Sequence, residues 1–265
     1  MSKARGGLAT LGRDIAVSLA FLTRIPAKRL GLGTEEAPDI ATAARAFPIA
    51  GGLIGAAGGA VLALANALNL PPLAACLLAI AALILLTGGL HEDGLADTAD
   101  GFGGGRDATK RLAIMRDSRI GSYGALALVL SVGLRASLLA AFLPGAALAG
   151  IFALIASEAL GRAAIVYNWR TLPPARLDGL AAGIGQPRHA TFSAALVLAI
   201  GIGLAAGIFA AGLLGAIVAL AAAALAATSF ASLSLRLIGG HSGDTLGAAG
   251  QLTALAALLA LVAFR

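Results

Sequence analysis

A short acidic stretch, residues 91–105, interrupts a part of the chain that is otherwise apolar. Four carboxylates lie within nine positions of this stretch, whereas residues 46–90 contain no Asp, Glu, Lys or Arg. If a helix continues through the stretch, Asp93, Asp97 and Asp100 share one face because they are spaced i, i+4 and i+7. Carboxylates stacked in this way repel each other unless a cation lies between them. The spacing therefore predicts a cation site, although the glycines of the stretch disfavour a regular helix beyond Asp100.

The ligand types favour Mg²⁺, or alternatively Mn²⁺, over Zn²⁺. Carboxylate oxygens suit these hard cations, and the one cysteine, Cys76, lies inside an apolar run where a buried structural role is expected. His91, at the head of the stretch, is placed either to accept a proton from an attacking hydroxyl or to hold an aspartate in position. The alternative to a metal site is a solvated loop that ends a helix, but such a loop is not expected to carry acids alone. The predicted metal ligands are Asp93, Asp97, Asp100 and, from a later loop, Asp244, enough for two ions beside a diphosphate.

The composition indicates an integral membrane protein. Apolar residues make up 59% of the chain and charged residues 12%, about half the charged share of a soluble domain. Mean hydropathy is +0.92, and the apolar residues form long runs where a soluble chain would show amphipathic stripes. The net charge of +6 is assigned to membrane topology. Nucleic acid is not an expected partner, because no patch interleaves aromatic and basic residues.

The apolar runs predict about seven transmembrane helices of roughly 20 residues each. Two long charge-free runs each suit a pair of spans, and three shorter runs suit one span each. We therefore predict an all-α, polytopic helical bundle over residues 46–264, within a single membrane-embedded catalytic domain that covers residues 1–265. The paired spans are expected in residues 46–90 and 190–235 and the single ones at about 123–143, 146–166 and 246–264, with turns at 66–72, 144–145 and 211–215.

The N-terminal segment, residues 1–45, is predicted to lie at the membrane interface. Its apolar part, residues 15–22, is too short to span, so an interfacial or re-entrant helix ending near Pro26 is expected. A short amphipathic segment at residues 106–119 is expected along the membrane surface. With seven spans, the N-terminal segment and all three polar loops share one side, which holds sixteen of the nineteen basic residues. The positive-inside rule makes that side cytoplasmic.

Basic residues near the acidic stretch are candidates for binding phosphate. Arginine binds phosphate oxygens in a bidentate manner, and residues 116–119 place two arginines around an aspartate and a serine. The alternative is ordinary positive-inside charge, which explains some of these residues. The predicted substrate-binding set is Arg24, Lys110, Arg116, Asp117, Ser118 and Arg119.

Three charged residues fall inside predicted spans, at Arg135, Glu158 and Arg162. Glu158 and Arg162 are spaced i, i+4, and Glu158 can also pair with Arg135 on the neighbouring helix. Structural pairing and the lining of a functional path are both open for these residues. His189 and His241 are interpreted as ordinary interfacial histidines.

Four motifs together resemble the cobalamin synthase family. They are FLTRIP at residues 21–26, HEDGLADTADG at 91–101, IMRDSRIG at 114–121 and GDTLGA at 243–248. The motifs occur in the family's order and span nearly the whole chain. The aspartate run with its downstream Arg-Asp-Ser-Arg is far more specific than an isolated Asp-x-x-Asp. Beside the last motif, Ser242 stands where threonine is expected, which leaves Asp244 intact as a candidate.

The resemblance implies an enzyme of the bacterial inner membrane whose active face is cytoplasmic. Such an adenosylcobinamide-GDP ribazoletransferase joins adenosylcobinamide-GDP to α-ribazole, or to its 5′-phosphate, and releases GMP in a Mg²⁺-dependent phosphoryl transfer. The aspartates would hold Mg²⁺ on the diphosphate, and His91, Asp97 or Asp100 would accept the proton of the hydroxyl. The partners implied are these substrates and membrane lipids; a second copy of the chain and other enzymes of vitamin B12 assembly are left open.

Two other functions fit the same residues less well. A lipid-type phosphotransferase or a prenyltransferase also pairs two aspartate-rich cytoplasmic loops with Mg²⁺. A transporter would use the acidic stretch as a cation site and the charged residues of the spans as a path. It would need charged groups near the midplane of the membrane, whereas most charges here lie at one end.

Overall fold

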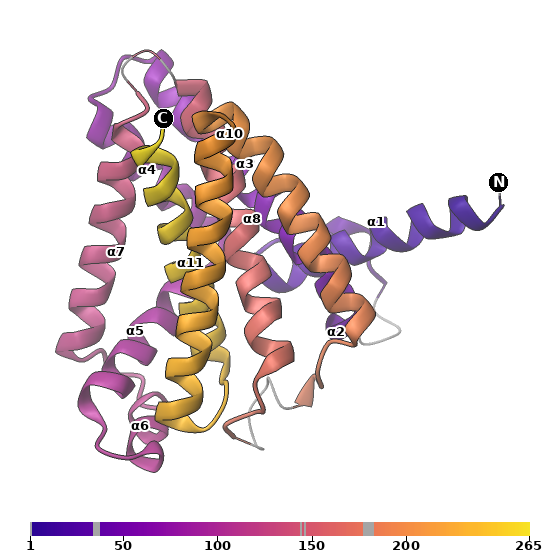
Figure 1. Ribbon diagram of the computed structural model, residues 1–265, viewed down its shortest axis with the longest axis vertical. Coiled ribbons are helices and arrows are strands. Elements are labelled where there is room, and N and C mark those ends of the chain that lie inside the picture. Colours follow the sequence, from indigo (N-terminus) through magenta and orange to yellow (C-terminus); the bar gives the residue numbers. More distant parts are fainter. Residues whose placement is uncertain (1, 34–37, 144, 146, 177–182) are drawn as a thin grey trace.

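The protein is a bundle of long helices (Figure 1). The computed structural model describes residues 2–33, 38–143, 145, 147–176 and 183–265, with side chains from residue 10 onward. Within these ranges no β-strand forms beyond one isolated bridge, between Pro174 and His241, which confirms the predicted all-α class. The helices are α1 (Ser2–Leu22), η1 (Ala27–Leu30), α2 (Ile40–Ala43), η2 (Ala44–Ala46), α3 (Phe47–Ala67), α4 (Pro72–Thr87), α5 (Leu90–Gly104), α6 (Ala108–Ile114), α7 (Ser122–Ala140), α8 (Ala147–Thr171), α10 (His189–Ile238) and α11 (Gly243–Ala263).

Several of these helices are long and apolar enough to cross a membrane. The described residues contain five, namely α2 with α3 as one unit, α7, α8, α10 and α11, or up to six if α4 and α5 form one broken span. The longest, α10, is interrupted at Gly212, where φ is 73° and ψ is 177°. Its two halves pack against each other in opposite directions, so the break is the predicted turn at 211–215. The polytopic membrane bundle is confirmed, and the count of seven spans stays a prediction.

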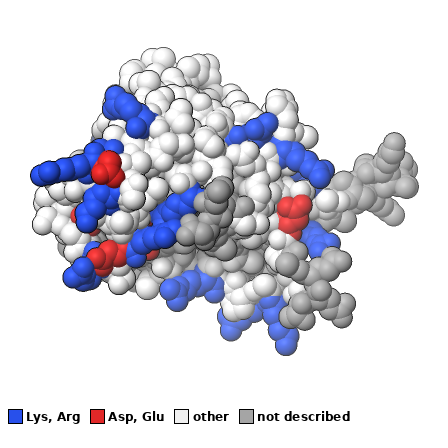
Figure 2. Space-filling model, turned by 90° about the horizontal axis from the view of Figure 1, so that it is seen from below, with Lys and Arg blue, Asp and Glu red and all other residues white. Residues whose placement is uncertain are grey.

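The polar segments gather at one end of the bundle. In Figure 1, α5, α6 and the start of α11 lie at the lower end, and the α3–α4 turn, the break in α10 and the C-terminus lie at the upper end. Figure 2 shows basic side chains spread over the lower face. This one-sided arrangement agrees with the predicted topology. Pro144, in the predicted turn before α8, lies outside the described residues.

The N-terminal helix is longer than expected and extends sideways from the bundle (Figure 1). It runs continuously over Ser2–Leu22, whereas the sequence pattern indicated a helix only in its apolar second half. Two contacts fix it to the segment before α3: the Ser18 hydroxyl donates to the Ala43 carbonyl oxygen at 3.0 Å, and Arg45 pairs with Asp14. The helix lies across the bundle direction, and its position at the membrane interface stays a prediction.

Glycines let α3 pack directly against the backbone of α8. Gly51 and Gly55 are four residues apart and face the same side. A Cβ at Gly55 would lie 2.5 Å from the Leu154 carbonyl oxygen, and one at Gly51 would collide with the Glu158 carbonyl oxygen. Because helices in lipid associate through close packing and not through the exclusion of water, these contacts hold the centre of the bundle together.

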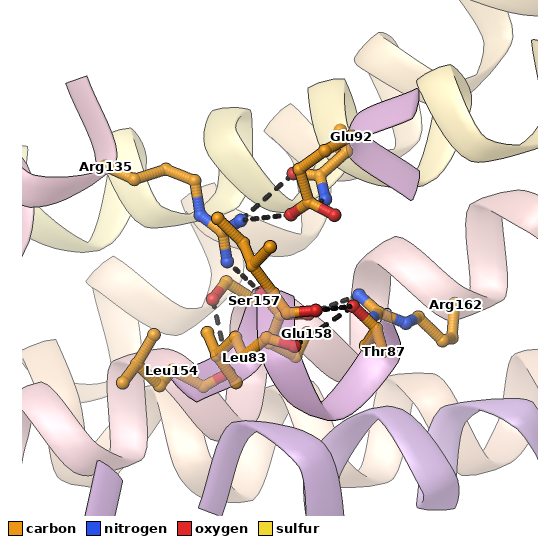
Figure 3. Close-up of polar contacts among 10 residues, drawn as sticks. Leu83, Thr87, Glu92, Arg135, Leu154, Ser157, Glu158 and Arg162 are labelled. Carbon is orange, nitrogen blue, oxygen red and sulfur yellow. Dashed lines mark hydrogen bonds and ion pairs between the residues drawn. The ribbon is translucent and has the colours of Figure 1, made fainter. Parts of the chain in front are cut away.

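A network of charged side chains is buried between α5, α7, α8 and α11 (Figure 3). Glu158 is paired with both Arg135 and Arg162, and the three side chains are at most 4% exposed. The Arg135 Nη1 atom also donates to Gln251 Oε1 at 3.0 Å and lies 3.6 Å from Glu92 Oε1. Two acids therefore balance two bases, which limits the cost of burying them. Of the two roles open for these residues, the structure shows the pairing.

We predict that Gly55→Ala lowers the thermal unfolding midpoint of the purified protein in detergent micelles. The added methyl group would push α3 away from α8, an overpacking that costs about 1–3 kcal/mol. Gly133→Ala is the matched control, because no atom lies within 4 Å of the Cβ position there. Equal midpoints for the two variants would contradict this account of the α3–α8 contact.

Candidate active site

The corner between α4 and α5 turns the acidic stretch across the lower end of the bundle. Gly88 and Gly89 adopt left-handed conformations, with φ of 69° and 72°, and the two helix axes differ by 92°. The Arg24 side chain packs against Gly88, at the place where a Cβ would otherwise stand. The Arg24 amide also donates to the Leu86 carbonyl oxygen at 2.8 Å. The corner thus brings a predicted phosphate-binding residue to the start of α5.

The acidic stretch forms one continuous helix, so the expectation of an irregular chain beyond Asp100 is wrong. The late glycines of α5 are points of close packing. A Cβ at Gly101 would lie 2.5 Å from Met115 Cγ, and one at Gly103 would lie 2.7 Å from the Tyr123 ring. The packing of α6 and α7 therefore supports a helix that local propensity disfavours.

Helices α5 and α11 approach each other closely at Gly94. A Cβ at this position would lie 2.7 Å from the carbonyl oxygen of Asp244, which is in the first turn of α11. The contact brings Asp244 to the face of α5 that carries Asp93 and Asp97. The negative charges of Asp93, Asp244 and Asp100 all act on the Asp97 carboxylate. The four predicted metal ligands therefore lie at the same end of the bundle.

Arg176 belongs to this cluster, although the sequence pattern did not single it out. Its Nη2 atom donates to Asp244 Oδ2 at 2.9 Å, and the Ser242 hydroxyl donates to the same oxygen at 3.1 Å. Backbone hydrogen bonds of 2.8 Å between residues 173–175 and His241 hold the Arg176 segment beside the start of α11. In the sequence, Arg176 stands in a polar loop that is predicted to lie on the same side of the membrane as Asp244, and this shared side could have indicated its place in the site.

The oxygen donors of these carboxylates suit a magnesium ion, but the carboxylates do not form a closed cage around one. Within the described ranges, no group of three or more His, Cys, Asp or Glu side chains is arranged to hold a metal. Mg²⁺ often takes only one or two carboxylates and completes its shell with water and substrate phosphates. Asp93 and Asp97 line one cavity and offer only oxygen donors. The residues therefore fit an ion that is shared with a phosphate substrate.

Asp100 is directed toward a different element. Its Oδ2 atom accepts from the Gly121 amide at 2.7 Å, and its Oδ1 atom accepts from the Gly124 amide at 2.9 Å. These amides belong to the start of α7, where a negative charge is favourable. Asp100 follows Asp93 by seven residues, about 10 Å along the helix axis. It lines neither cavity described next, so its predicted roles as metal ligand and proton acceptor stay predictions.

Two cavities meet at Asp93. The first cavity has a volume of about 340 Å³, and the second, of about 660 Å³, is more open and more polar. The second cavity gathers the predicted site residues Arg24, Asp93, Asp97 and Ser118. The first cavity contains His91, Asp93, Arg176, His241 and Asp244 among its lining residues. A ligand in either cavity would therefore meet the Asp93 carboxylate.

The basic residues after the acidic stretch do not reach these cavities. Lys110, Arg116 and Arg119 line neither of them. The Arg119 Nε and Nη2 atoms donate to the Asp117 carboxylate at 3.0 and 2.7 Å on the exposed surface. This hydrogen bonding lowers the pKa of Asp117 to about 2. Residues 116–119 thus form a surface turn whose serine reaches the second cavity, and phosphate binding by the other members of the set stays a prediction.

Two buried histidines line the first cavity. His91 is 2% exposed and His241 is 1% exposed, and no described residue offers a hydrogen bond to any of their four ring nitrogens. Burial lowers the pKa of His241 to about 4, so this imidazole is neutral near pH 7. A neutral imidazole presents one donor and one acceptor. The interpretation of His241 as an ordinary interfacial residue is therefore wrong.

Comparison with known proteins identifies the family. Residues 14–262 match the family described as cobalamin-5-phosphate synthase. The chain belongs to this family. The adenosylcobinamide-GDP ribazoletransferase of Sinorhizobium medicae is 47% identical over 253 residues, 94% of this chain and 95% of the relative. The protein of the same name from Brucella canis is 47% identical over 254 residues, 94% of this chain and 96% of the relative. No solved structure matches the chain.

Membership of the cobalamin-5-phosphate synthase family confirms the resemblance drawn from the four sequence motifs. Each of those motifs falls within the matched residues 14–262. The motif at residues 21–26 supplies Arg24 to the second cavity, and the motif at 91–101 supplies its aspartates. The motifs therefore converge on one end of the bundle, although they are up to 220 residues apart in the sequence.

We predict that Asp100→Ala lowers the thermal unfolding midpoint in detergent micelles, because it leaves the Gly121 and Gly124 amides without their acceptor. The cost is about 1–3 kcal/mol for partly buried amides. Asp100→Asn retains one oxygen acceptor, so its midpoint should lie between those of Asp100→Ala and the wild type. A wild-type midpoint for Asp100→Ala would show that this carboxylate does not hold the start of α7.

Proposed function

We propose that this chain is an adenosylcobinamide-GDP ribazoletransferase. It joins adenosylcobinamide-GDP to α-ribazole, or to the 5′-phosphate of α-ribazole, and releases GMP. The observation that carries the proposal is the meeting of Arg24, Asp93 and Asp97 in one cavity of a chain that belongs to the cobalamin-5-phosphate synthase family. Cations and carboxylates gathered in this way suit a diphosphate and its counter-ion.

The reaction replaces one oxygen substituent on a phosphorus atom with another. A ribose hydroxyl oxygen of ribazole forms a bond to the phosphorus that carries cobinamide. The bond from that phosphorus to the oxygen bridging toward guanosine breaks, and GMP leaves with the electron pair. The hydroxyl proton passes to a base of the protein and then to solvent. Such a transfer depends mainly on positioning and on neutralising charge.

Several residues would hold and neutralise the diphosphate. Mg²⁺, when bound, would stabilise the negative charge that develops on the phosphate oxygens. Asp93 and Asp97, with Asp244 from across the α5–α11 contact, are the residues that would hold the ion. Arg24 in the second cavity would donate to phosphate oxygens. Arg176 already offsets the charge of Asp244 in the absence of substrate.

Two residues are candidates for accepting the hydroxyl proton. His91 lines the first cavity beside Asp93, and its ring nitrogens lack a described partner. Asp97 lines the second cavity with Arg24. Both satisfy the requirement that a general base lie near the reacting groups. The pH profiles of kcat for His91→Gln and Asp97→Asn would separate them, because loss of the base flattens the acidic limb.

We propose that the enzyme lies in the bacterial inner membrane with its active end in the cytoplasm. The basic residues gathered at the lower end support this orientation (Figure 2). The acidic helix α5 and both cavities lie at the same end. A corrinoid substrate is far too large for either cavity, so it would approach from the open lower face with only its nucleotide end inserted.

We predict that Asp93→Asn and Asp97→Asn each reduce GMP release at least about 100-fold, equivalent to roughly 3 kcal/mol of transition-state stabilisation. The measurement is GMP formed from adenosylcobinamide-GDP by purified enzyme in detergent, with α-ribazole and Mg²⁺. Asp107→Asn is the matched control, because asparagine serves equally well at the N-cap of α6, where Asp107 accepts from the Lys110 amide.

The same assay tests the proposed reaction itself. GMP release should require α-ribazole or its 5′-phosphate and should stop when EDTA removes Mg²⁺. Release that continues at the same rate without either acceptor would contradict the ribazoletransferase activity and favour a different diphosphate-cleaving enzyme. Wild-type rates in both aspartate variants would exclude the carboxylate pair from the reaction.

A further inference from the structure

Three aromatic side chains, Phe21, Phe47 and Trp169, are part of the wall of the first cavity. Phe21 and Phe47 stack with ring centroids 5.9 Å apart and an interplanar angle of 19°, and the Phe47 and Trp169 centroids lie 6.4 Å apart. The Trp169 indole Nε1 donates to the Gly185 carbonyl oxygen at 2.8 Å, which fixes the ring in place. Phe47 is fully buried between the other two rings, so Phe21 and Trp169 provide the aromatic surface that suits a flat, mostly apolar ligand.

Six of the residues that line this cavity are polar, and the two histidines among them have no described hydrogen-bond partner. Leaving a buried hydrogen-bonding group unpaired is unfavourable, so four unpaired ring nitrogens on His91 and His241 call for a ligand or ordered water. The other polar lining residues are Asp93, Arg176, Ser242 and Asp244, and of these Asp93 also lines the second cavity. A ligand in the cavity would therefore have its apolar part among the rings and its polar part toward Asp93.

We propose that the first cavity binds the base and ribose of ribazole, with the planar benzimidazole ring against Phe21 and Trp169. This inference rests on the proposed function and assigns its acceptor subsite. His241 donates to the one free ring nitrogen of the base, and His91 bonds a ribose hydroxyl. The ribose then lies beside Asp93, where the first cavity meets the cavity that holds Arg24 and Asp97. The attacking hydroxyl and the diphosphate thus approach each other from two sides of one carboxylate.

The alternatives fit this cavity less well. A volume of about 340 Å³ is near the lower limit of ligand pockets, which is roughly 300 Å³, and excludes a corrin macrocycle. Guanine has donors and acceptors along its edges and less apolar surface than dimethylbenzimidazole, whereas the wall of the cavity is mainly apolar. A lipid chain would leave both histidines unpaired. Benzimidazole, with one free ring nitrogen and a large apolar surface, matches what the walls offer.

Trp169 allows binding to be measured directly, because it is the one tryptophan of the chain and lines the cavity. We expect 5,6-dimethylbenzimidazole and α-ribazole to change its fluorescence in a saturable manner, in purified protein in detergent and without adenosylcobinamide-GDP. GMP at the same concentrations should give no saturable change. His241→Phe retains a ring of similar size and should raise the Kd of α-ribazole about tenfold, an effect expected when one hydrogen-bonding partner is lost.

A cavity-filling variant tests the same subsite through kinetics. Ile184→Phe adds volume at the wall and should raise the KM for α-ribazole about tenfold, while the KM for adenosylcobinamide-GDP stays within twofold. Ile200→Phe makes the same change on an exposed part of α10 and should leave both values at wild-type level.

The outcomes separate this inference from the proposed function. Wild-type turnover without any saturable change in Trp169 fluorescence, or an unchanged KM for α-ribazole in Ile184→Phe, would overturn the cavity as the ribazole subsite and leave the activity standing. A saturable fluorescence change with 5,6-dimethylbenzimidazole in a protein that releases no GMP would support the subsite and overturn the proposed reaction. Equal responses to α-ribazole and GMP would show that the cavity does not select the base.

Discussion

The backbones of α5 and α11 meet where Gly94 lies against Asp244, and the arrangement of the charged groups follows from that contact. Any side chain at position 94 would separate the two helices. With hydrogen in its place, the capped first turn of α11 delivers Asp244 to the acidic face of α5. The carboxylates then repel each other at the membrane end of the bundle, where uncompensated charge is costly. Arg176 compensates part of this charge, and a shared cation would compensate more.

The acids of α5 are divided among three neighbours. Glu92 accepts from Gln251 at 2.8 Å and joins the buried arginine network, Asp93 and Asp97 line the cavities, and Asp100 holds the start of α7. A straight helix can do this because its side chains diverge around the axis and are displaced along it by about 1.5 Å per residue. One short acidic stretch therefore supplies both structural pairing and the open carboxylates of the site.

The position of Asp93 between two cavities has a mechanistic meaning. A group-transfer enzyme must hold donor and acceptor on opposite sides of the reacting phosphorus, close together and aligned. Two cavities of different polarity that share Asp93 are consistent with such a division. The buried side chains of Arg135, Glu158 and Arg162 are paired with one another, which limits the cost of burying their charges in the bundle.

The sequence by itself determined the membrane class, the grouping of charge at one end and the identity of the family. Each of these follows from features that lie close together along the chain, such as apolar runs, loop charges and the motif at residues 91–101. The same is true of the acidic face, since helical periodicity places Asp93 and Asp97 one turn apart.

Only the tertiary structure decided which neighbour each side chain meets. Local propensity favoured a break after Asp100, but packing of α6 and α7 against the glycines of α5 maintains the helix. Asp100 and His241 carry no sequence signal for their surroundings, because the Gly124 amide and the cavity rings come from distant parts of the chain. The physical reason is that hydrogen bonding and burial depend on contacts between segments, whereas sequence patterns report only the order within one.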